Sequence, residues 1–188
     1  MSRSYHHGDL RRAVLRAAVD VIAESGPAAV SLRDLARRAG VSHAAPAYHF
    51  GDKAGLLTAV AVEGFSLLGD ALVAAYERTE SFLEMGVSYV RFAVAHPAHF
   101  EVMYRPDLYH ADDPELLAAR RRTSELLYGG LASLSDGKAG DDSQVAGVAA
   151  WSLVHGFATL WLGGNLPPEL GADPEAAARS VARMLFSG

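Results

Sequence analysis

The sequence predicts an all-α protein of about nine helices, and three observations support that fold class. Apolar side chains recur at helical spacing in every sizeable segment of the 188 residues. No segment alternates apolar and polar residues with the period of two that marks a half-buried strand. Helix start and stop residues separate the segments, and no internal repeat is present.

Local start and stop signals set the predicted bounds. Gly26-Pro27 ends the first apolar run. Ser31 begins the second helix in the capping-box-like Ser31-Leu-Arg-Asp34, and Gly40 ends it. Asp173 begins the last helix, with Pro174 at its first position. The predicted helices span residues 10–22, 32–39, 42–49, 54–76, 81–95, 98–104, 114–134, 144–162 and 174–186.

Composition excludes several classes of protein. Half of the residues are hydrophobic and 21% are charged, which is enough apolar side chain for a packed core and argues against disorder. Because the chain has no Cys, disulfide scaffolds, Cys-ligated zinc and Cys nucleophiles are excluded. The first residues contain no apolar run, so we expect no secretory signal and a cytoplasmic protein.

The net charge of −5 is unevenly distributed. Residues 1–55 carry eight Lys and Arg against five acidic residues, whereas residues 56–188 carry nine against seventeen. A basic segment attached to an acidic remainder is typical of a head that binds a polyanion such as nucleic acid. A chance unevenness of a few charges is the alternative.

Residues 143–168 contain no charged side chain, a length that also fits a membrane span. We reject a span because Ser152, His155 and Thr159 interrupt it and because its flanks are acidic. A helix that is apolar on every side needs cover on every side, and a small protein has few helices of its own to provide it. The sequence therefore predicts a dimer seam that involves this helix and the last one.

Residues 31–53, SLRDLARRAGVSHAAPAYHFGDK, carry the motif that points to a function. Two short helical segments meet at Gly40, which permits a left-handed turn. Val41 is placed to fill the angle between them, and Ser42 is placed to cap the second. This arrangement is typical of a helix-turn-helix, whose second helix enters the major groove of DNA. An ordinary helical corner is the alternative.

Several motifs, in the same order, resemble the TetR family of bacterial transcriptional regulators. Over residues 9–60 they are the Gly40-Val41-Ser42 turn, His49-Phe50, Lys53 and the Leu56-Leu57 pair. Further along, the start at residues 5–11, His96-Pro97, and Trp151 followed by His155-Gly156 resemble one branch of the family, named for its Trp-His-Gly element.

The resemblance implies a homodimeric repressor that a small-molecule effector releases from a palindromic operator on the nucleoid. It implies a helix-turn-helix DNA-binding domain over residues 1–54 and a ligand-binding and dimerisation domain over residues 55–188. No nucleophile elbow, phosphate loop or carboxylate pair is present, so we expect neither an enzyme nor a cofactor. Two alternatives stay open: a regulator without an effector, and a helical ligand-binding or catalytic dimer with a vestigial head.

Candidate DNA contacts lie on the second helix of the motif and near the start of the first. Small Ala44 and Ala45 allow a close approach to bases, and His43, Tyr48 and His49 are the polar side chains in reach. For His49, packing in the core of the head is the alternative. The predicted set is Ser31, Arg33, Ser42, His43, Ala44, Ala45, Tyr48, His49 and Lys53, of which Ser31, Arg33 and Lys53 are placed for backbone phosphates.

The motif departs from the family pattern at one position. The family usually has Tyr three positions before the Phe, but Ala47 stands there and Tyr48 follows it. One step along a helix rotates a side chain by about 100°, which puts the usual Tyr–phosphate contact in doubt. Pro46 removes a backbone donor, so the second helix is expected to start as a tight turn.

Aromatic and Met side chains in the second part of the chain predict an apolar effector pocket. The predicted lining is Phe92, Met103, Tyr104, Tyr128, Trp151 and His155. Plain core packing of these side chains is the alternative. Pro97 disrupts the helix that would align His96 with His99, so no metal site is expected.

Overall fold

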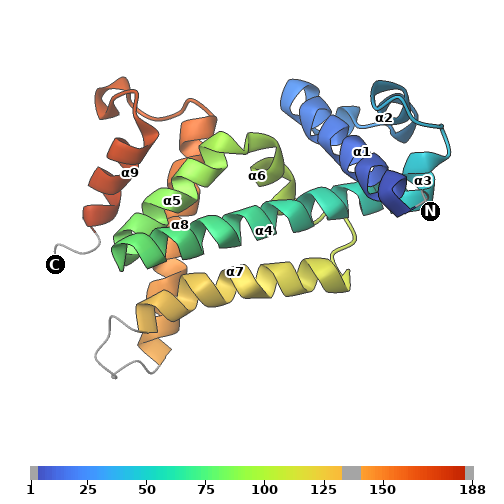
Figure 1. Ribbon diagram of the computed structural model, residues 1–188. Helices are drawn as coiled ribbons and strands as arrows, with labels where there is room; N and C mark the ends of the chain where they lie inside the picture. Colours follow the sequence, from blue (N-terminus) through green and yellow to red (C-terminus); the bar gives the residue numbers. More distant parts are fainter. Residues whose placement is uncertain (1–3, 133–140, 185–188) are drawn as a thin grey trace. The chain divides into compact units, whose positions relative to one another are not determined.

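The computed structural model describes the backbone of residues 4–132 and 141–184, and the side chains of residues 10–127 and 145–184. These parts contain nine α-helices and no strand (Figure 1), so the predicted all-α class is confirmed. The helices are α1 Ser4–Ser25, α2 Leu32–Arg38, α3 Ala45–Phe50, α4 Lys53–Thr79, α5 Phe82–Ala95, α6 Pro97–Met103, α7 Pro114–Ala132, α8 Asp141–Leu162 and α9 Pro174–Arg183. Two short 3-10 helices, η1 Pro27–Ala29 and η2 Pro168–Leu170, are additional to the sequence prediction.

The chain divides into two compact units. The first unit consists of Met1–Phe65 and Pro97–Ala118, and the second consists of Ser66–His96 and Ala119–Gly188. Helix α4 is continuous and contributes residues to both. The first unit thus holds the predicted head together with the first part of α4 and α6. The functional division at residue 54 stays a prediction.

The first unit is built on the buried faces of α1, α2 and α4. Val14 from α1, Leu35 from α2 and Leu56 from α4 are completely shielded from solvent. Ile22 and Val60 extend this core, and α1 also contacts α6. The apolar stripes that predict these helices are therefore the faces that pack together.

Gly64 would ordinarily weaken α4, and its packing against α6 explains why it is there. A Cβ at this position would overlap the Met103 side chain, so the glycine allows α6 to pack directly on the α4 backbone. The cost of a glycine within a helix is about 1 kcal/mol relative to Ala. The buried Met103 side chain offsets that cost with apolar contacts.

The second unit has α5 at its centre, in contact with α8 and α9 (Figure 1). Tyr89 and Val90 of α5 are fully buried, and Phe157 of α8 is almost so. Helix α9 buries only the small side chains of Ala177, Ala178 and Ala182. Ala177 therefore packs inside its own chain, whereas Met184, directly after α9, is exposed.

Side-chain caps begin three of the helices, and those at Ser31 and Asp173 are the predicted ones. The Ser31 hydroxyl accepts a hydrogen bond from the Asp34 N–H at 3.5 Å, and the Ser81 hydroxyl accepts one from the Glu84 N–H at 3.4 Å. The Asp173 carboxylate accepts from the Glu175 N–H at 2.9 Å. Each cap satisfies a backbone donor that the first helical turn leaves without an intrahelical partner.

Two ion pairs connect α9 to α5. The Arg179 guanidinium donates from Nε to Glu84 at 2.8 Å and from Nη2 at 2.9 Å. The Arg91 guanidinium donates in the same two-pronged way to Glu175, with its Nε at 2.6 Å. The hydrogen bond from Arg179 lowers the pKa of Glu84, and the one from Arg91 lowers the pKa of Glu175. Because α9 buries only alanines, these charged bonds add to the attachment of an otherwise weakly apolar helix.

Acid should weaken this attachment. An unfolded Glu has a pKa near 4.5 and both folded values are lower, so the pairs stabilise the folded state above that pH. Their contribution is lost as pH falls through the folded-state pKa. A Glu84→Gln, Glu175→Gln double variant should lose about 1–2 kcal/mol of unfolding free energy at neutral pH. Its stability should also fall less steeply in acid.

Denaturant titrations at neutral pH and near pH 4 measure both effects. Asp70→Asn is the matched control, because it removes an exposed carboxylate that pairs with Arg122 outside the α5–α9 contact. A double variant with the wild-type pH dependence would show that the two pairs do not hold α9.

Candidate functional site

The turn between α2 and α3 depends on Gly40. Its φ of 67° lies in the left-handed region, which a residue without a Cβ adopts at little cost. Its N–H donates to the Arg37 carbonyl at 3.3 Å, and the Val41 N–H donates to the Ala36 carbonyl at 2.9 Å. These two bonds close the end of α2 and direct the chain into α3.

Helix α3 starts later than predicted. It begins at Ala45, its cap residue Ala44 has no side-chain hydrogen bond, and residues 43 and 44 form a turn. The prediction that Ser42 caps this helix is therefore wrong. Ser42 contributes its carbonyl instead, which accepts from the Ala45 N–H at 3.0 Å. The reason is Pro46, which is tolerated only in the first helical turn. The predicted tight turn before the helix is confirmed.

The two faces of α3 differ in exposure. Ala45, Pro46 and Phe50 are buried in the first unit, whereas the Tyr48 side chain is 79% exposed. His43, Ala44 and Ala47 are also exposed. Ala45 thus packs inward, which corrects the expectation that it approaches bases. His49 is half-buried, with its ring near those of Tyr48 and Phe50.

Two of the predicted phosphate contacts lie at or near the start of α2. Ser31 is its cap residue and Arg33 is exposed in its first turn. Lys53, at the first position of α4, donates from Nζ to the Ala28 carbonyl at 2.8 Å. Lys53 therefore has a structural bond to η1 that the sequence does not predict. The separation of 25 residues leaves no local signal for it.

A second feature that sequence reasoning misses connects the segment after α6 to the start of α4. The His110 N–H donates to the Thr58 hydroxyl at 3.0 Å, and the His110 ring lies 3.3 Å from Asp52 Oδ1. Asp52 also accepts from the Gly55 N–H at 2.7 Å. The Gly55 bond and His110 lower the pKa of Asp52. Arg11, Gly55, Thr58 and His110 border a polar recess of about 240 Å³ beside α3.

The predicted effector residues fall in both units. Met103 and Tyr104 belong to the first unit, where Met103 is buried and the Tyr104 ring lies 5.3 Å from that of Phe100. Phe92, Trp151 and His155 belong to the second unit. The Tyr128 side chain lies outside the described residues.

Tyr89 connects Trp151 and His155, which are one turn apart on α8. Its hydroxyl lies 2.9 Å from Nδ1 of His155, and the Trp151 Nε1–H donates to it at 3.4 Å. Because an indole only donates, the Tyr89 hydroxyl accepts from Trp151. Burial lowers the pKa of His155, which favours its neutral form.

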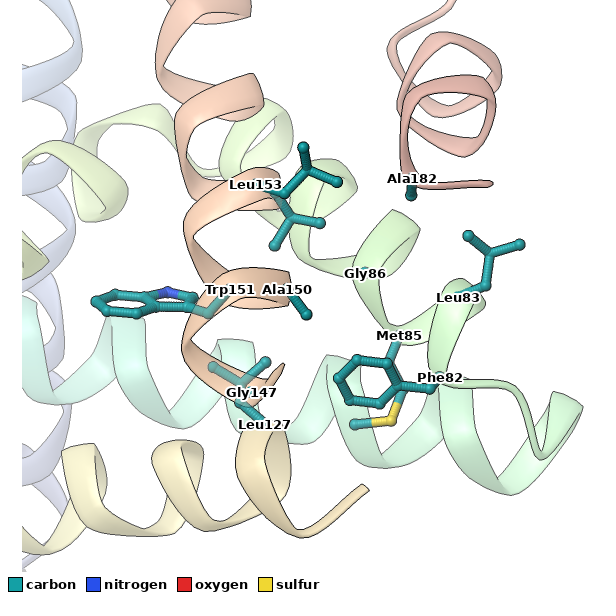
Figure 2. A pocket seen from close by; sticks show the side chains of 11 residues that line it. Phe82, Leu83, Met85, Gly86, Leu127, Gly147, Ala150, Trp151, Leu153 and Ala182 are labelled. Carbon is teal, nitrogen blue, oxygen red and sulfur yellow. The ribbon is translucent and has the colours of Figure 1, made fainter. Parts of the chain in front are cut away.

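Trp151 also borders a cavity of about 20 Å³ among α5, α7, α8 and α9. Figure 2 shows its apolar wall, with Phe82 and Met85 beside each other and Trp151 pointing away from Leu83 and Ala182. The lining contains no charged residue. A space of this size holds about one water molecule, so an effector in this place requires the helices to move apart.

Among the side chains of residues 10–127 and 145–184, no three His, Asp or Glu residues gather in a way that could hold a metal ion. His99 pairs instead with Glu63 at 2.9 Å.

Two described helices, α4 and residues Val145–Leu162 of α8, are long and apolar enough to cross a membrane by length and composition alone. More than half of the α4 window is buried, as in a core helix.

In the described residues, α2, the Gly40 turn and α3 form a helix-turn-helix, the motif that DNA-binding regulatory proteins use. Residues 14–60 match the family model described as bacterial regulatory proteins of the tetR family. Residues 82–185 match the model for the tetracyclin repressor-like C-terminal domain. The second match alone spans more than half of the chain, so the chain belongs to the TetR family.

Individual proteins are similar to this chain in sequence or in fold. A helix-turn-helix transcriptional repressor of Mycobacterium tuberculosis is 48% identical over 52 residues, which are 28% of this chain and 28% of the relative. A protein of unknown function from Rhodococcus sp. RHA1 is 33% identical over 98% of this chain and 97% of its own, with a TM-score of 0.81. The regulator PfmR from Thermus thermophilus shares the fold with a TM-score of 0.70 and 24% identity over 93% of this chain and 97% of its own.

The hydrogen bonds of Tyr89 should contribute measurably to stability. Tyr89→Phe keeps the ring but removes the hydroxyl from the His155 and Trp151 side chains, so it should lower the free energy of unfolding by about 1–3 kcal/mol. Chemical denaturation followed by Trp fluorescence measures the change. Tyr76→Phe, at an exposed Tyr of α4, should leave stability unchanged. Equal stability of the two variants would show that the bonds of Tyr89 add nothing.

Proposed function

We propose that the chain is a dimeric transcriptional repressor in the bacterial cytoplasm. Each protomer places α3 in the major groove of one half of a palindromic operator, and a small-molecule effector releases the protein from DNA. The observation that carries this proposal is the exposed face of α3, which projects Tyr48 from a helix held by the Gly40 turn. Family membership and the match of residues 14–60 support it.

The DNA-facing residues follow from exposure. His43, Ala44, Ala47 and Tyr48 form the exposed side of the turn and of α3. Alanines leave room for thymine methyl groups, and Tyr48 takes the outward place beside the position where the family usually has its aromatic residue. Arg33 and the Ser31 hydroxyl are assigned to backbone phosphates. Lys53 keeps two ammonium donors for a phosphate after its bond to Ala28.

Dimerisation is assigned to α8, because one chain covers this helix poorly. Only 28% of the apolar window in α8 is buried, against 56% of the window in α4. Val145, Val148, Leu160 and Leu162 are exposed large apolar side chains on it. The exposed positions recur at helical spacing and form one stripe, which fits packing against the same helix of a second copy.

Gly156 lies within this stripe and supports the assignment. A Cβ added there meets no other described atom within 4 Å, so nothing in the described parts of the chain requires a glycine. Gly in the middle of a helix costs about 1 kcal/mol relative to Ala. Close approach of a partner helix would explain why the position has no side chain.

Tyr48→Ala should reduce specific operator affinity by roughly tenfold to a hundredfold, since one good base contact contributes about 1–3 kcal/mol. Arg33→Ala should instead weaken all DNA about equally and lower the salt slope by about one unit. The operator is first obtained by sequencing DNA fragments retained by the purified protein, and affinity is measured by fluorescence anisotropy at several salt concentrations. Tyr76→Ala is the control on α4 and should bind as the wild type does. If retained fragments show no dyad symmetry, or if Tyr48→Ala binds them normally, the assignment of α3 is wrong.

Leu160→Asp should convert the dimer to monomers, because a buried unpaired charge costs several kcal/mol by rough estimate. Leu117→Asp on α7 is a matched control: the two leucines are 45% and 48% exposed, and the chemical change is identical. Light scattering after size-exclusion chromatography gives the oligomeric state, and circular dichroism checks folding. A dimeric Leu160→Asp protein would place the seam on another surface.

A further inference from the structure

A groove of about 220 Å³ runs between α4 and α5 in the second unit. It is separate from the small cavity beside Trp151, and the two share no lining residue. Its walls are Leu67, Ala71, Ala74 and Arg78 from α4, and Ser88, Arg91, Phe92, Ala95 and His96 from α5 and its end. A groove of this volume suits one aromatic ring or a short aliphatic chain with a polar group.

The polar groups of the groove favour an anion. None of the nine lining residues is acidic, whereas Arg78 and Arg91 are cationic and His96 carries an imidazole. The remaining hydroxyl, that of Ser88, donates to the Ala71 carbonyl at 3.1 Å and belongs to the packing of α5 on α4. The other lining side chains are apolar. The arrangement is complementary to a molecule with an apolar body and one negative charge.

The two arginines have different roles. Arg91 donates from Nε and Nη2 to Glu175, so its position is held and much of its charge is already balanced. Arg78, in the last turn of α4, is exposed and forms no ion pair with another residue in the described parts of the chain. Arg78 is therefore the side chain with an uncommitted positive charge at this groove. An open site with one such cation gives selectivity for charge but only modest affinity.

The apolar wall has a flat part. The Phe92 and His96 rings lie 5.1 Å apart with an angle of 33° between their planes. Phe92 is 3% exposed, so packing holds its ring in place, and with His96 it forms a firm part of the groove wall. Ala71, Ala74 and Ala95 leave the space above it open because their side chains are small.

We propose that this groove binds a small amphipathic carboxylate, with its apolar body against Phe92 and its carboxylate facing Arg78. If the protein is an effector-released repressor as proposed above, such a carboxylate is the chemical class of effector that this site accepts. The α4 wall of the groove belongs to the same continuous helix whose first turns lie in the unit that carries α3. A ligand that separates α4 from α5 therefore acts on a helix shared with the DNA-binding unit.

The binding test uses the DNA-free, full-length protein and benzoate as the probe. Calorimetry should detect one benzoate per chain, and the neutral isostere benzamide should bind up to about fivefold more weakly, since one charge pair of this exposure contributes up to about that factor. Hexanoate should compete with benzoate, and added salt should weaken both.

Two variants and one control locate the site. Arg78→Gln should weaken benzoate by about fivefold while leaving benzamide unchanged. Ala74→Phe, at an exposed position of α4, should fill the groove and abolish binding of both probes. Arg121→Gln removes one exposed cation of α7 that does not line the groove, and it should leave benzoate affinity unchanged. Any of four results would overturn the proposal. Two concern the wild type: no benzoate binding, or equal affinity for benzoate and benzamide. The other two concern the variants: equal losses of benzoate affinity in the two arginine variants, or an Ala74→Phe protein that still binds.

The regulatory consequence is measured separately on the operator. Benzoate or hexanoate at saturating concentration should weaken operator binding by the wild type but not by Ala74→Phe. Because operator affinity without ligand is measured in the same titration, a failure to bind DNA contradicts the proposed repressor function. Normal DNA binding together with no benzoate binding contradicts only the groove.

Discussion

Helix α4 supplies buried side chains to both compact units, so both cores depend on one unbroken helix of 27 residues. Leu56, Leu57 and Val60 are shielded from solvent in the first unit, and Leu68 and Leu72 are shielded in the second. A helix transmits changes along its length because each backbone hydrogen bond joins neighbouring turns. A displacement of the second half of α4 therefore acts on the same helix whose first turn follows α3.

In the second unit, α8 and α9 are held by different kinds of contact. Helix α9 contributes alanines to the core, and its charged bonds to Glu84 and Arg91 supply directed contacts that alanines lack. Helix α8 is rich in large apolar residues, yet many of them face solvent in the single chain. Helix α9 is thus held by charge within the chain, and α8 offers an apolar stripe to another chain. This contrast is why the proposed dimer rests on α8 more than on α9.

Much of the helical framework follows from local sequence signals. Ser31, Ser81 and Asp173 cap helices because their oxygens need only reach a backbone N–H two or three residues away. Gly40 ends α2 for an equally local reason. Ser42 shows where prediction from local signals fails. Serine is a common cap residue, but Pro46 shifts the start of α3 beyond Ser42.

The tertiary structure alone decided which of the candidate residues face solvent and which have partners. Ala45 and Tyr48 are three residues apart on one helix, and only the packing of α3 buries the first and exposes the second. The bonds of Lys53 to Ala28, His110 to Thr58 and Tyr89 to His155 join residues 25, 52 and 66 positions apart. The sequence by itself determined the helices, the turn and the class of regulator, because those signals act over a few residues. Contacts between distant residues depend on how whole helices pack, which no short pattern records.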